Sequence, residues 1–193
     1  MHDYILAPSY LAFYHAHHVF GHFSAEPHRI RPSGLDTSGS DKYFLRTRLE
    51  LIGADLLIAT RYLEFETHSG EVVDITDEVQ EALEKTSLKT GVVTVFVTGA
   101  TAAVTTIEYE DGLVADLGDA LQRIAPVGID YAHNERWHDG NGHSHIRASL
   151  LGPSIVVPFC DRRLMLGTWQ QIVFLELDNR PRKRKVVVQI MGE

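Results

Sequence analysis

Residues 91–108 read GVVTVFVTGATAAVTTIE and carry the clearest fold signal in the chain. Apolar and β-branched residues fill both halves of this stretch, which is the composition of β-strands. The short segment at residues 98–101 contains Gly99 and separates the two halves, so we expect two neighbouring strands joined by a turn. The nearly continuous apolar run at residues 92–97 further predicts a strand that is buried on both faces.

The segments before and after residues 91–108 predict further strands and two helices. Residues 61–68 and 72–75 predict two strands, and Thr76 is a candidate N-cap for the helix that follows them. Residues 113–124 predict a second helix with one apolar face. Three further strands are expected at residues 155–159, 168–177 and 185–191. The order ββ-α-ββ-α-βββ indicates an α+β fold with two helices rather than a doubly wound sheet.

The composition excludes several classes of protein. The chain has 193 residues, 44% of them hydrophobic, and its 18 Lys+Arg against 26 Asp+Glu give a net charge of −8. This balance fits one soluble domain and opposes both a disordered acidic chain and a nucleic-acid binder. The single Cys160 excludes an internal disulfide and a cysteine-based zinc site. No segment is long and apolar enough to span a bilayer, so we expect a cytoplasmic protein with no membrane or nucleic-acid partner.

Residues 1–60 differ from the rest of the chain. Six of the 11 histidines lie in the first 28 residues, and a segment rich in Pro, Gly and Ser, EPHRIRPSGLDTSGSDK, follows them. We therefore expect an N-terminal extension over residues 1–60 and a folded domain over residues 61–193. Two explanations stay open: a lineage-specific extension, or a native start nearer to Thr60.

The densest chemistry lies in residues 130–145, which we expect to form a loop. Four histidines share it with three carboxylates: His133, His138, His143 and His145 with Asp130, Glu135 and Asp139. Imidazole is the commonest metal ligand in proteins, and carboxylates complete three-ligand sites that leave a position for water. The alternative is a polar surface loop. His143 and His145 would face one side only if the segment were extended.

Other residues suggest anion binding. The loop with Gly99 and Thr101 could present N–H and hydroxyl groups to an anion, and Arg147 could grip a phosphate. Each has a plain alternative as a turn or a solvated cation. The basic run at residues 182–185, RKRK, is interpreted as a solvated turn that also protects a strand edge.

Residues 61–193 resemble the YjbQ-like family, often called secondary thiamine-phosphate synthase enzymes. The matching segments occur in order: VVDITDEV, TGATAAVTTIEYEDG, YAHNERWHDGNGHSHIRASLLGPS, LMLGTWQQIVFLELD and VVVQIMGE. The resemblance implies a small β-sandwich with helices, assembled as a homotrimer with its site near the subunit boundary.

The resemblance also implies the site. Its catalytic candidates are Glu108, His133, His145 and Arg147. Glu108, His133 and His145 would bind a divalent metal, and Gly99, Thr101 and Asn141 would bind a cofactor or a phosphorylated molecule. The chain departs from the family where many members carry His-Thr and this one has Gly99-Ala100, so His143 or His138 would have to replace that histidine.

The implied activity joins a pyrimidine pyrophosphate to a thiazole phosphate, which needs Mg²⁺. A His-rich site favours zinc instead, which suggests that the synthase activity is a side reaction. Two alternatives stay open: a metal-dependent hydrolase or lyase acting on a small molecule, and a trimeric metal- or ligand-binding protein without turnover.

Overall fold

The computed structural model describes residues 45–51 and 54–193, and the side chains from residue 56 onward. These residues belong to one compact unit, Ser40–Glu193. The histidines and the Pro/Gly/Ser-rich segment of the first 44 residues lie outside the described part. Strand β2 begins at Ala54 and continues through residue 60 without a break.

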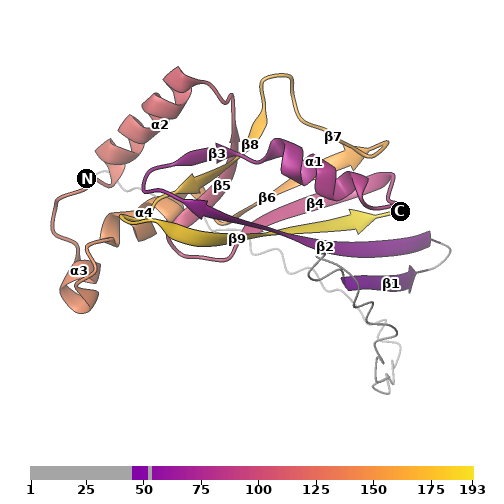
Figure 1. Ribbon diagram of the computed structural model, residues 1–193, viewed down its shortest axis with the longest axis horizontal. Helices are drawn as coiled ribbons and strands as arrows, with labels where there is room; N and C mark the ends of the chain where they lie inside the picture. Colours follow the sequence, from indigo (N-terminus) through magenta and orange to yellow (C-terminus); the bar gives the residue numbers. More distant parts are fainter. Residues whose placement is uncertain (1–44, 52–53) are drawn as a thin grey trace, which may run out of the picture. The chain divides into compact units, whose positions relative to one another are not determined.

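The larger of two antiparallel sheets has six strands in the order β1-β2-β9-β4-β6-β7 (Figure 1). Its strands are β1 (Leu45–Leu51), β2 (Ala54–Thr67), β9 (Arg182–Gly192), β4 (Thr90–Val97), β6 (Ser154–Cys160) and β7 (Arg163–Leu164). The smaller sheet has the order β3-β8-β5, with β3 (Val72–Asp74), β8 (Gln171–Glu176) and β5 (Ala102–Ile107).

Apolar side chains from both sheets form one shared core. Val95 of β4 and Val188 of β9 are buried in the same cluster as Phe174 of β8 and Val104 of β5. Helix α1 (Thr76–Glu84) adds Val79 and two further apolar side chains to it. Two sheets packed over a common core are a sandwich arrangement, and the mixed α+β class is confirmed.

Two helices cover the other face of the smaller sheet. Leu121 of α2 (Asp111–Ile124) and Ala148 of α4 (Gly142–Leu151) pack with Val173 and Leu175 of β8. Strand β8 therefore lies between two apolar layers, which explains why residues 172–178 are all buried. Within the described residues, no helix is long and apolar enough to cross a membrane.

Three expectations about the strands and caps are wrong. Strands β4 and β5 belong to different sheets, because the chain crosses from one to the other at residues 98–101. Strand β4 buries only alternate residues, and Phe96 is 42% exposed. The N-cap of α1 is Ile75; the Thr76 hydroxyl instead donates to Asp74 Oδ1 at 2.6 Å.

The histidine-rich segment is also not a loop. It forms α3 (Ala132–Trp137) and the first turns of α4, so the described chain has four helices instead of two. The left-handed backbone of His138, with φ of 55°, ends α3 and lets the chain turn into α4. The basic run RKRK is likewise part of strand β9 and not a turn.

Candidate functional site

The imidazoles of His133 and His145 are brought together by the joint between α3 and α4. The Asn134 side-chain oxygen accepts a hydrogen bond from the backbone N–H of Gly142 at 2.9 Å, which ties the two helices at this point. A Cβ atom at Gly142 would lie 2.5 Å from Tyr131 Cβ, so this close approach requires glycine. As a result the rings of His133 and His145 lie with their centroids 4.3 Å apart.

Asp139 and Asn141 surround this pair with polar groups. Asp139 Oδ2 lies 3.6 Å from His133 Nε2, a contact that is an ion pair only when His133 is protonated. With its side-chain nitrogen turned toward them, Asn141 donates to His133 Nε2 at 3.3 Å and to the two Asp139 oxygens at 2.9 and 3.1 Å. The opposite amide orientation leaves only a 3.4 Å contact to Asp178, so the first orientation satisfies more groups.

The environment keeps His145 neutral at pH 7. Burial lowers its pKa, and the neighbouring His133 lowers it further, against smaller opposing effects of Asp139 and Asp178. A neutral imidazole can accept a proton or ligate a metal, whereas an imidazolium can do neither.

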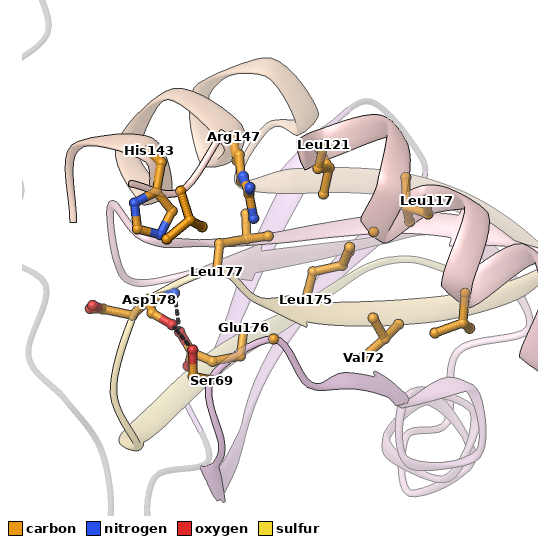
Figure 2. Close-up of a pocket in the computed structure, with 14 residues that line it drawn as sticks. Ser69, Val72, Leu117, Leu121, His143, Arg147, Leu175, Glu176, Leu177 and Asp178 are labelled. Atoms are coloured by element: carbon orange, nitrogen blue, oxygen red, sulfur yellow. Dashed lines mark hydrogen bonds between the residues drawn. The ribbon is translucent and has the colours of Figure 1, made fainter. Parts of the chain in front are cut away.

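Helix α4 separates the predicted site into two faces. Residues two apart on a helix point roughly 200° away from each other, so His143 and Arg147 face away from His145. Both line a cavity of about 280 Å³ between α2, α4 and the end of β8. Figure 2 shows them descending from α4 toward Leu177, with Leu117 and Leu121 of α2 beside them. His143 is buried, whereas His145 is partly exposed.

The guanidinium of Arg147 is held in place from two sides. Its Nε donates to the carbonyl of Ala125 at 2.9 Å, and Nη2 donates to Gln122 Oε1 at 2.8 Å. Desolvation by burial lowers the pKa of Arg147, partly offset by Tyr131. The group stays charged at pH 7, because the ordinary pKa of arginine is far higher.

A buried ionic network that no sequence motif had indicated joins the end of β8 to the start of β9. Arg184 donates to Glu176 through Nε at 2.6 Å, and Arg182 Nε donates to Asp178 at 2.7 Å. Burial alone would raise the pKa of Asp178, but hydrogen bonds from Arg182, from the Asn179 N–H and from Thr101 lower it. The alternation of Arg and Lys in RKRK is the signal that could have shown this, since residues of a strand alternate between its two faces.

The loop at residues 98–101 supports this network. The Thr101 hydroxyl donates to Asp178 at 3.0 Å and accepts from Arg184 at 2.9 Å, while the Gly99 N–H donates to the Val97 carbonyl at 3.1 Å. A Cβ atom at Gly99 would lie 2.9 Å from Arg184 Nη1. These donors are therefore engaged within the protein, and anion binding by this loop stays a prediction.

Glu108 lies apart from the histidines. It is exposed and follows the end of β5 that is remote from Thr101, on the order of 20 Å away at about 3.3 Å per residue. Its neighbour Glu110 instead caps α2 by accepting from the Gly112 N–H at 2.8 Å. In the part of the chain that the structure describes, no three His, Cys, Asp or Glu side chains form a group that could hold a metal ion. The predicted triad of Glu108, His133 and His145 is not assembled within one described chain.

Known proteins resemble this chain over the same region. The UPF0047 protein of Archaeoglobus fulgidus is 40% identical over 121 residues, which are 63% of this chain and 91% of that protein. UPF0047 protein YugU of Bacillus subtilis is 35% identical over 127 residues, 65% of this chain and 93% of that protein.

Solved structures agree with the fold. The crystal structure of a YbjQ-like protein of unknown function from Sulfolobus solfataricus has a TM-score of 0.65 and 33% identity. The match covers 70% of this chain and 99% of that one. The family model described as "UPF0047 protein YjbQ-like" matches residues 61–193, and the chain belongs to this family.

Proposed function

We propose that this chain is an enzyme that moves protons on a small molecule with the imidazoles of His133 and His145. The observation that carries this proposal is the 4.3 Å separation of two rings that come from different helices. An adjacent pair of imidazoles can supply one proton acceptor and one proton donor to the same substrate. The lowered pKa of His145 suits it to accept the proton.

Three features support a catalytic rather than a structural pair. The side chains of His133 and Asp139 are 31% and 36% exposed, so a substrate can reach them from solvent. Asp139 can balance the charge of His133 when the imidazole is protonated. Asn141 is buried and joins both groups, which reduces their freedom to move.

The described residues do not make a complete metal site. Three protein ligands are usual at a catalytic zinc, and His133 and His145 supply two neighbouring imidazoles. The third predicted ligand, Glu108, lies beyond the far end of β5. The proposed chemistry therefore uses the imidazoles themselves, and a metal at this pair would need a further donor, for example Glu108 of another copy of the chain.

We further propose that the chain assembles as a homotrimer. Several large apolar side chains are exposed on the helices and on β6, among them Trp137 (62%), Leu150 (60%) and Val156 (60%). A contiguous apolar surface is typical of a site that another protein covers, and these side chains are candidates for the interface that the family resemblance implies. Such an assembly could place Glu108 of one copy beside the histidines of another, near the subunit boundary that the family resemblance implies.

The test is a substrate panel with matched variants. The panel contains the pyrimidine pyrophosphate and thiazole phosphate pair, small phosphate esters and small carbonyl compounds. His133→Gln and His145→Gln should each lower turnover by about 10²–10⁴-fold, the usual contribution of general acid–base catalysis. His68→Gln, at an exposed turn, is the control. Turnover that survives in both site variants, or no turnover of any compound by the wild-type protein, would contradict the proposal.

Elemental analysis of untagged protein distinguishes a metal-free imidazole pair from a metal centre that a second copy completes. Protein without bound metal that still turns over a substrate supports chemistry by the imidazoles. A stoichiometric transition metal that is lost in His133→Gln and in Glu108→Gln would show instead that a second copy completes a metal centre.

A further inference from the structure

The cavity on the opposite face of α4 is mostly apolar. It lies between the Ser69-Gly70 turn, α2, α4 and the end of β8 (Figure 2). Its apolar walls come from β3, α2, β8 and two connecting segments: Val72, Val114, Leu117, Leu121, Val127, Leu175 and Leu177. Its volume of about 280 Å³ is just below the range of about 300–1,000 Å³ that is typical of small-molecule sites.

Arg147 contributes an unbalanced positive charge to this cavity. The lining also includes Glu176 and Asp178, but these carboxylates are paired with Arg184 and Arg182. Within the described residues Arg147 has no carboxylate partner; its recorded hydrogen bonds go to the Ala125 carbonyl and to the Gln122 side chain. Arg147 is partly buried, so it loses part of its hydration without gaining a counterion, and an anionic ligand would offset that loss.

The two recorded bonds leave donors of Arg147 for a ligand. Nε and one Nη2 hydrogen are used, so the two hydrogens of Nη1 and the other of Nη2 are available. His143 lies one helical turn away on the same face and makes no side-chain hydrogen bond to any described residue. Its ring can therefore donate to a second oxygen of a bound anion.

We propose that this cavity binds a small carboxylate with an apolar body. The carboxylate pairs with Arg147 and His143, and the apolar body packs against Leu117, Leu121 and Leu175. One guanidinium matches a monoanion, whereas a phosphate dianion in an apolar cavity would need further cations. The apolar walls offer little to a sugar or another polar body. This site is separate from the imidazole pair and does not depend on the proposed catalytic role of that pair.

The test uses octanoate as the probe, with binding measured by calorimetry and by NMR shifts of the leucine methyl groups. Wild-type protein should bind octanoate more tightly than acetate, and inorganic phosphate should not compete. Arg147→Gln should weaken octanoate binding by about tenfold or more, because it removes a charge-assisted hydrogen bond. Leu117→Trp should fill the cavity and abolish binding while Arg147 stays in place.

Matched controls make each outcome decisive. Arg123→Gln removes an exposed cation from α2 and should bind like wild type. His145→Gln should also bind normally, which separates this site from the catalytic proposal. Unfolding curves show whether each variant is folded. Equal binding of octanoate by wild type, Arg147→Gln and Leu117→Trp, or competition by phosphate at similar concentration, would overturn the proposal.

Discussion

His133 of α3 and His145 of α4 lie with their ring centroids 4.3 Å apart and an interplanar angle of 46°. They are 12 positions apart in the sequence, and the tie between Asn134 and Gly142 brings them together. His145 lies within the electrostatic field of His133, so a change at His133 should appear in the titration of His145.

The titration of His145 should respond in opposite directions to its two neighbours. His133→Gln removes a charge that opposes protonation, so the pKa of His145 should rise. Asp139→Asn removes a charge that favours protonation, so the pKa of His145 should fall. NMR titration of the imidazole protons measures both, and the wild-type value should lie below the ordinary value of about 6.5. Shifts of the same sign in both variants would contradict this arrangement.

Burial of His143 should make stability depend on pH. Burial, followed by Arg147, lowers the pKa of His143 in the folded protein. The contribution of neutral His143 to the free energy of unfolding is therefore complete above the unfolded pKa of about 6.5. It is lost as the pH falls toward the pKa of His143 in the folded protein. His143→Phe should flatten the fall in unfolding free energy as the pH drops below about 6.5, by at most about 1.4 kcal/mol per pH unit. Urea unfolding at several pH values is the measurement, and an unchanged slope would contradict it.

The two cations at the start of β9 should differ in importance. Arg184→Met leaves Glu176 buried without its partner and should cost about 3–5 kcal/mol of unfolding free energy. Lys183→Met breaks only the exposed pair with Glu66 and should change stability by less than about 1 kcal/mol. Denaturant unfolding compares the two variants directly. A loss of unfolding free energy in Arg184→Met as small as that in Lys183→Met would show that the network contributes little.

Two glycines offer a matched test of the joint between α3 and α4. Gly142→Ala places a Cβ atom against Tyr131 and should destabilise the protein by about 1–3 kcal/mol. Gly118→Ala, in the middle of α2, meets no atom within 4 Å and should stabilise it by up to about 1 kcal/mol. Thermal unfolding measures both. A neutral Gly142→Ala would mean that the joint tolerates displacement.

The oligomeric state tests the exposed apolar surface. Light scattering during gel filtration should give three times the chain mass of 21.6 kDa for the wild-type protein. Leu150→Asp, at an exposed position of α4, should shift the protein toward monomers, because a charge would be buried at the interface. The exposed Lys183→Met is the control and should leave the mass unchanged. A monomeric wild-type protein would contradict the trimer.

Local pattern was enough for most of the regular structure. Of the alternating residues 61–68, all but the last are part of β2, and the amphipathic stretch 113–124 is most of α2. The segments at residues 92–97 and 102–107 are strands β4 and β5, as expected. Residues 61–67 and 113–124 were predictable because burial of one face leaves a period in the sequence, whereas β4 and β5 were predictable from their apolar and β-branched composition. Ordered motifs also showed the family, which the family model confirms.

The candidate site was predictable only as a set of residue types. Helix α4 has a weak amphipathic pattern, since His143 and Ser144 are buried beside the partly exposed His145. Histidines and carboxylates gave no helical period, so this segment was interpreted as a loop. A predicted loop gives no information about which residues share a face, so the sequence did not indicate that Arg147 and His145 lie on different faces of one helix.

The sequence by itself determined seven of the nine described strands, two helices, the family and the residue types available for chemistry. Only the tertiary structure decided that β4 and β5 belong to different sheets. It also decided that Arg182 pairs with Asp178 and Arg184 with Glu176. It also placed His133 beside His145 and left Glu108 apart from both. The physical reason is that pattern reports whether a residue is buried, whereas contact between distant residues depends on how separate elements pack.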